Sequence, residues 1–204
     1  MKHMAVQIAE ITDHLFLSGR GAITSERLGL LGITHILNVA EEIHNMNYPS
    51  DYPIICHLVA MKDNSSETIL NFVDECFDFI CDAKKIGGRI LVHCVAGISR
   101  SASVCIMYLM KYYNLTLLNA YNNVLSCRDC IYPNTGFWRS MIEFEFNLRG
   151  ENSVEMRPYI FGWRPNVFPS DLPFLLRGWM DYILAFYTRH ILIFLLQIIW
   201  LCFT

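Results

Sequence analysis

The stretch from Arg89 to Tyr113 constrains the fold more than any other part of the chain. Its first five residues, RILVH, form a short apolar run of the kind found in a strand that is covered on both faces of a sheet. A helical pattern resumes at Ser101 and continues to Tyr113. The residues between them must turn a buried strand directly into a helix, as in the repeating unit of α/β sheets.

The rest of the first 150 residues also alternates between strand and helix patterns. Apolar runs bounded by turn residues predict strands at 6–11, 15–17, 35–39 and 54–59. Helical spacing predicts helices at 24–31, 116–126 and 136–148. A further helix is predicted within 65–87, where Ser65 or Ser66 can cap the start and Gly87 can close the end. We therefore predict an α/β fold with a central mixed sheet flanked by helices.

The loop CVAGISR, residues 94–100, has the composition of an anion-binding cradle. Ala96 is small and Gly97 is conformationally free, so the backbone can curl until successive N–H groups point inward. The following helix adds the positive end of its dipole, and Arg100 supplies a planar guanidinium that can hold two oxygens of a tetrahedral oxyanion. The predicted phosphate-binding residues are Val95, Ala96, Gly97, Ile98, Ser99 and Arg100.

Cys94 is the predicted nucleophile of this loop. The same field that holds a phosphate stabilises a thiolate and makes the sulfur nucleophilic. Ser99 or Ser101 can donate a hydrogen bond to the sulfur, and His93 is predicted to orient the loop, because a thiolate needs no base. The alternative is a strand-to-helix turn with an inert buried cysteine, which leaves the pattern of His, Gly, Ser and Arg around Cys94 unexplained.

Residues 93–101, HCVAGISRS, resemble the Cys-x5-Arg signature of the cysteine-dependent protein phosphatases, in the HCxAGxSRS form of the dual-specificity phosphatases. The downstream segments SASVCIMYLMKYYNLTLLNAYNNV and YPNTGFWRSMIEFE are similar to the later helices of the small atypical members of that family. The resemblance covers about residues 6–150. It implies the cysteine-phosphatase fold and hydrolysis of phosphotyrosine and phosphoserine or phosphothreonine through a phosphocysteine, without a metal or cofactor.

The resemblance also implies that Asp63 is the general acid, because it stands thirty-one residues before Cys94. From the residues alone, a capping or solvated loop role would be the simpler interpretation of Asp63. Lys62 and the following Asn64-Ser65 depart from the family pattern, and the charge of Lys62 would weaken Asp63 as an acid.

Two later positions also carry expectations from the resemblance. Asn134 matches a Pro-Asn-x-Gly-Phe segment and is expected to support the catalytic loop, although a turn residue after Pro133 is an equally good local interpretation. Arg128-Asp129 stands where the family often has Arg-Pro, a change expected to affect a turn and not the chemistry.

Two other functions stay open beside a protein phosphatase. One is hydrolysis of a non-protein phosphate ester such as a lipid, which the absence of lysine from residues 95–98 disfavours. The other is a catalytically weak module that binds phosphoprotein.

Composition excludes some partners and indicates a compartment. A formal net charge of -3 gives no general basic field for nucleic acid. Eight cysteines are scattered through predicted elements, and the N-terminus lacks a secretory h-region, so a reducing, cytoplasmic location is predicted. The pair in CRDC, Cys127 and Cys130, is interpreted as structural, because no second pair at metal-binding spacing accompanies it.

The chain is predicted to divide into a catalytic domain at 1–150, a linker at 151–171 and a hydrophobic tail at 172–204. Residues 191–204 contain no charge, but fourteen residues of helix reach only about 21 Å, against about 30 Å for a hydrocarbon core. The tail is interpreted as an interfacial or anchoring membrane segment, or as a helix that packs on the body or a partner.

Overall fold

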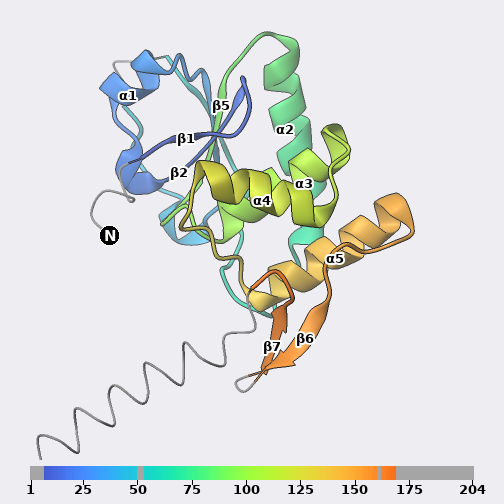
Figure 1. Ribbon diagram of the computed structural model, residues 1–204. Helices are drawn as coiled ribbons and strands as arrows, with labels where there is room; N and C mark the ends of the chain where they lie inside the picture. The colour runs from blue at the N-terminus through green and yellow to red at the C-terminus, as the bar shows by residue number, and fades with distance from the viewer. Residues whose placement is uncertain (1–6, 50–52, 160–161, 169–204) are drawn as a thin grey trace, which may run out of the picture. The chain divides into compact units, whose positions relative to one another are not determined.

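The computed structural model describes residues 7–49, 53–159 and 162–168, which include a five-stranded sheet (Figure 1). The strand order is β1-β2-β5-β3-β4. β1 is antiparallel to β2, whereas β2, β5, β3 and β4 run parallel to one another. The predicted mixed sheet is thus confirmed, with strands at Ala9–Glu10 (β1), Leu15–Gly19 (β2), His35–Asn38 (β3), Ile55–Leu58 (β4) and Ile90–Cys94 (β5).

Helices cover both faces of this sheet, as predicted (Figure 1). On one face, Leu28 of α1 (Ser25–Leu30) packs in a cluster with Phe16 of β2 and Leu91 of β5. On the other face lie α2 (Val73–Lys85) and α3 (Arg100–Tyr112), and α3 is covered in turn by α4 (Leu117–Cys127) and α5 (Thr135–Arg149). Because α3 lies between the sheet and these helices, its residues from Arg100 to Met110 are all buried.

The central strand β5 positions the end of the sheet that carries Cys94. All five of its residues are buried, and β2 and β3 flank it in parallel, with Gly19 opposite Cys94 and Asn38 opposite His93. The carboxyl ends of three parallel strands therefore meet beside Cys94. Ligands of parallel α/β sheets bind at this edge.

The start of α2 differs from the prediction of a cap at Ser65 or Ser66. The Asn64 side chain accepts hydrogen bonds from the backbone N–H groups of Ser66 and Glu67 and from the Ser66 hydroxyl. This local turn diverts the serines from capping. A short 3₁₀ helix, η4 (Ile69–Asn71), follows, and α2 begins only at Val73.

The region predicted to be a linker contains a hairpin of β6 (Met156–Tyr159) and β7 (Gly162–Pro165). β7 packs against α5, and the compact unit extends to Val167. The sequence pattern did not predict these strands, because each contains a proline, Pro158 or Pro165, and proline argues against a strand. The predicted tail at 172–204 lies outside the described residues. Within the part that the structure describes, no helix is long and apolar enough to cross a membrane.

Candidate active site

Cys94 is the last residue of β5, and its sulfur accepts two hydrogen bonds. The Gly97 N–H and the Ser101 hydroxyl each donate to Sγ at 3.2 Å. The residue is only 2% exposed. Two hydrogen-bond donors, one from the loop backbone and one from α3, are therefore directed at this sulfur.

The carbonyl groups of residues 95–98 all point out of the loop. Val95 O accepts from the Arg20 N–H, Ile98 O from the Tyr132 N–H, and Ala96 O and Gly97 O from the guanidinium of Arg128. In each peptide group the carbonyl and the N–H of the next residue point in opposite directions. The N–H groups that follow these four carbonyls therefore face into the loop. The loop therefore has the form of a cradle for an oxyanion, at the N-terminus of α3.

Two glycines allow this loop to lie directly against the end of β2. Gly97 has a φ of +70°, and a Cβ there would collide with the backbone of Ser18 and Gly19. A Cβ on Gly19 would in turn lie 2.7 Å from the carbonyl oxygen of Ala96. The close approach of the two backbones excludes any side chain at these two positions.

Arg100, the first residue of α3, is 3% exposed and is held by two partners. Its Nη1 and Nη2 donate to the two carboxylate oxygens of Glu42 at 2.5 Å, and Nη1 also donates to Met61 O at 3.0 Å. This guanidinium lowers the pKa of Glu42. Within the described residues Arg100 Nε is buried without a hydrogen bond, so a donor is left for an oxyanion in the cradle.

Asp63 lies at the edge of the cradle, with one carboxylate oxygen engaged and the other directed toward Arg100. Its Oδ1 accepts from the Ser99 hydroxyl at 2.8 Å and from Asn134 Nδ2 at 2.9 Å. Its Oδ2 lies 3.6 Å from Arg100 Nε, and the side chain is 34% exposed. The Nζ of Lys62 lies 3.9 Å from the Glu41 carboxylate, so Lys62 has an acidic partner other than Asp63.

The Asn134 side chain has two partners. Its Oδ1 accepts from the Phe137 N–H and caps α5, while its Nδ2 donates to Asp63. A Cβ at Gly136 would collide with the backbone of Ser65. The segment that carries Asp63 is thus seated on the first turn of α5.

His93 is buried behind the loop in a defined tautomer. Its Nδ1 lies 3.2 Å from Cys94 O, which can only accept, so Nδ1 carries the proton. Its Nε2 then accepts from the Tyr48 hydroxyl at 2.7 Å. Burial lowers the pKa of His93 to about 4, so the ring is neutral at pH 7.

The lowered pKa of His93 predicts a loss of stability in acid. Between pH 6.5 and about 4, the unfolded chain binds a proton that the folded chain excludes, so the free energy of unfolding falls as the pH falls. The stabilisation is complete above pH 6.5, and about 3 kcal/mol is lost by pH 4. Urea unfolding across this range should show a steeper decline for the wild type than for His93→Asn.

The matched control for this prediction is His44→Gln, because His44 is an exposed histidine. We expect His44→Gln to follow the wild-type decline. Equal declines for the wild type and His93→Asn would contradict the assignment to His93.

The sequence did not indicate the roles of three residues of the site: Glu42, Tyr48 and Arg128. Arg128 is buried and donates to Gly97 O at 2.8 Å, Ala96 O at 3.1 Å and Gln7 O at 3.1 Å. Arg128 thus holds two carbonyls of the loop, whereas the departure from the family pattern lies at the next residue, Asp129. Glu42 follows β3, and a polar residue soon after a predicted strand is a signal that could have found it. No local signal identifies Tyr48 or Arg128.

The family described as "Dual specificity phosphatase, catalytic domain" matches residues 15–147 of this chain. The chain belongs to the dual specificity phosphatase family. Dual specificity protein phosphatase 14 of Homo sapiens is 41% identical over 174 residues, which cover 84% of this chain and 86% of that protein. Dual specificity protein phosphatase 18 of Homo sapiens is 36% identical over 167 residues, which cover 81% of this chain and 87% of that protein.

Solved structures show the same fold as this phosphatase. Human DUSP28 matches with a TM-score of 0.62 and 30% identity, over 70% of this chain and 95% of that one. The human tyrosine phosphatase-like serine/threonine/tyrosine-interacting protein matches with a TM-score of 0.65 and 30% identity, over 70% and 98% of the two chains. The resemblance seen in HCVAGISRS is thus confirmed, and the chain is a dual-specificity protein phosphatase.

Proposed function

We propose that this phosphatase hydrolyses phosphoproteins with Cys94 as nucleophile, Arg100 and the N–H groups of residues 95–99 as the phosphate site, and Asp63 as general acid. The observation that carries the proposal is the orientation of the loop. Four consecutive carbonyls bind donors outside it, above a sulfur that accepts two hydrogen bonds. Donors held toward the point where negative charge develops stabilise a transition state.

The reaction then proceeds in two balanced steps. Cys94 Sγ attacks phosphorus, the S–P bond forms as the P–O bond breaks, and Asp63 gives its proton to the leaving oxygen. Water next attacks the phosphocysteine, Asp63 takes a proton from it, and the S–P bond breaks to release phosphate and the thiolate. Ser101, whose hydroxyl donates to the sulfur, stabilises the thiolate as it leaves.

The arrangement around Asp63 supports Oδ2 as the atom that carries the proton. Oδ1 already accepts from Ser99 and Asn134, so a proton on Oδ1 would have to displace a donor. Oδ2 lies on the side of Arg100 Nε, where the phosphate group would be bound. The leaving oxygen would therefore meet the acid directly.

The chemistry of the cradle supports phosphorylated protein side chains as substrates. Residues 95–98 contain no lysine or arginine, so the cradle matches one phosphate group and lacks the additional cations that favour highly charged lipid head groups. Phosphotyrosine, phosphoserine and phosphothreonine each offer a single phosphate ester.

Replacing Asp63 with asparagine tests the assignment of the acid. We expect kcat to fall about 10²-fold, because a positioned general acid contributes this order of magnitude. The loss should be larger for a phosphothreonyl peptide than for an activated aryl phosphate, since an alkoxide needs the proton more. Both substrates are measured without metal and across pH.

Asn134→Ser is the companion variant, because serine can still cap α5 but cannot donate an amide hydrogen to Asp63. We expect a smaller loss of kcat, about 10-fold, with little change in the melting temperature. Equal slowing of both substrates by Asp63→Asn would contradict a general-acid role. Bound phosphopeptide with no turnover in the wild type would indicate a phosphoprotein-binding module instead.

We propose that residues 172–204 associate with a membrane surface. The supporting observations are in the sequence: the last fourteen residues are uncharged, and Trp179, Tyr182, Tyr187 and Trp200 add interfacial aromatic residues. The catalytic part would then work in a reducing compartment on the cytoplasmic side. The seven cysteines in the part of the chain that the structure describes are all free, which supports this location.

Truncation after residue 171 tests the tail. We expect the full chain to sediment with phospholipid vesicles and the 1–171 chain to remain in the supernatant, because only the former carries the apolar segment. The same partition for both chains would contradict membrane association. A 1–171 chain that also loses turnover would show instead that the tail supports the catalytic domain.

A further inference from the structure

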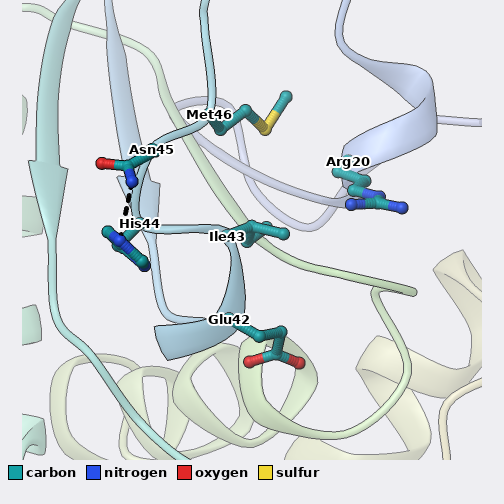
Figure 2. A pocket seen from close by; sticks show the side chains of 6 residues that line it. All are labelled: Arg20, Glu42, Ile43, His44, Asn45 and Met46. Carbon is teal, nitrogen blue, oxygen red and sulfur yellow. Dashed lines mark hydrogen bonds between the residues drawn. The ribbon is translucent and has the colours of Figure 1, made fainter.

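A cavity of about 280 Å³ lies beside the catalytic loop, and no step of the proposed mechanism uses it (Figure 2). Arg20 reaches it from η2 (Arg20–Ala22), the segment after β2. The other lining residues come from η3 (Glu41–Ile43) and the segment that follows: Glu42, Ile43, His44, Asn45 and Met46.

The cavity and the phosphate site share a wall. Both carboxylate oxygens of Glu42 bind Arg100, so one side chain lines the cavity and also holds the phosphate-binding guanidinium. Arg20 is tied to the other side of the loop, because its backbone N–H donates to Val95 O at 3.1 Å. A substrate with its phosphate on Cys94 would therefore place a neighbouring side chain at this cavity.

Arg20 supplies the charge in the cavity that is available to a ligand. Its side chain is exposed, and it makes no hydrogen bond or ion pair with the residues that the structure describes. Glu42 is paired with Arg100, and its pKa is lowered by the hydrogen bond from Arg100 and, to a smaller extent, by the charge of Arg20. His44 is engaged with Asn45, at 2.8 Å between Nε2 and Nδ2 (Figure 2).

We propose that this cavity binds an anionic side chain next to the phosphorylated residue and that Arg20 selects it. The ligand is a carboxylate or a second phosphate group. A basic side chain next to the phosphorylated residue is disfavoured, because it would have to compete with Arg100 for the Glu42 carboxylate. Ile43 and Met46 offer apolar contact for the stem of the side chain. The inference rests on the proposed roles of Cys94 and Arg100 as the phosphate site.

The test measures kcat/KM of the full chain on phosphotyrosyl peptides in which one flanking residue at a time is glutamine, glutamate or phosphoserine. At one flanking position we expect glutamate to exceed glutamine about 3-fold and phosphoserine to exceed it about 10-fold. Arg20→Gln should remove both preferences. Met46→Trp, which fills the cavity, should remove them while Arg20 is intact.

Lys62→Gln is the matched control, because it removes one exposed positive charge near the site but outside the cavity. It should change kcat/KM for every peptide by the same factor. No preference at any position in the wild type, or the same loss of preference in Lys62→Gln as in Arg20→Gln, would overturn the inference. Peptide affinities of Cys94→Ser are measured in parallel, so the preference is tested even where turnover fails.

Discussion

Cys94→Ser is expected to lower turnover by at least about 10⁴-fold, the largest effect of any single substitution in this phosphatase. Serine fits the space of the thiol and can accept from Gly97 and Ser101, whose donors lie 3.2 Å from the sulfur. It does not ionise near neutral pH, however, so the nucleophile is lost while the cradle remains. The measurement is metal-free hydrolysis of an aryl phosphate, together with calorimetric binding of a phosphotyrosyl peptide.

Cys56→Ser is the control for this experiment, because Cys56 is an exposed cysteine on β4. It should leave turnover and binding unchanged. The variant Cys94→Ser should retain peptide affinity, since Arg100 and the loop N–H groups are untouched. Residual turnover above about 1% in Cys94→Ser would mean that another group attacks phosphorus.

Gly97→Ala should be almost as damaging, although it adds only a methyl group. The new Cβ would collide with the backbone of Ser18 and Gly19, and the φ of +70° itself disfavours alanine. Backbone atoms at the end of a buried strand cannot move aside as a flexible side chain can. We expect the loop to be displaced, so that several of its N–H groups no longer point at the phosphate. As a result, kcat/KM should fall at least about 10³-fold.

Gly87→Ala separates backbone strain from collision. Gly87 has a φ of +74°, but a Cβ there would meet nothing within 4 Å. The substitution should cost about 1–2 kcal/mol of stability without a change in kcat/KM. Activity assays and chemical unfolding of both variants make the comparison. Wild-type activity in Gly97→Ala would show that the close approach of the loop to β2 is not required.

The parts of the site that could be predicted from sequence are those carried by neighbouring residues. The order of strand, loop and helix around Cys94 places the thiol, the loop amides and Arg100 together, because all three belong to one continuous segment. Asp63 reaches the loop from a distant segment, and only its family spacing singled it out. In the structure it contacts Ser99 and Asn134 through side chains, and such contacts depend on the packing of η4 and α5.

The residues that escaped prediction act across the fold. Glu42 faces Arg100 only because β3 and β5 are adjacent and end together. Arg128 reaches Gly97 because α4 packs on α3. The cap at Ser66 failed for a local reason, since the Ser66 hydroxyl donates to the Asn64 side chain instead of accepting from the helix. Hydrophobic spacing therefore predicted the layers, whereas long-range polar pairs required the assembled structure.

The three hydrogen bonds of Arg128 link residue 7, near the start of the chain, to the carbonyls of Ala96 and Gly97. The shape of the phosphate cradle is thus set when the whole domain folds. The loop has therefore already lost its conformational entropy before substrate arrives. Binding then needs no ordering of this loop, so affinity is not reduced by an entropic penalty at that step. For the same reason, substitutions near residue 7 can make the loop less ordered without contacting it, because they act through Arg128.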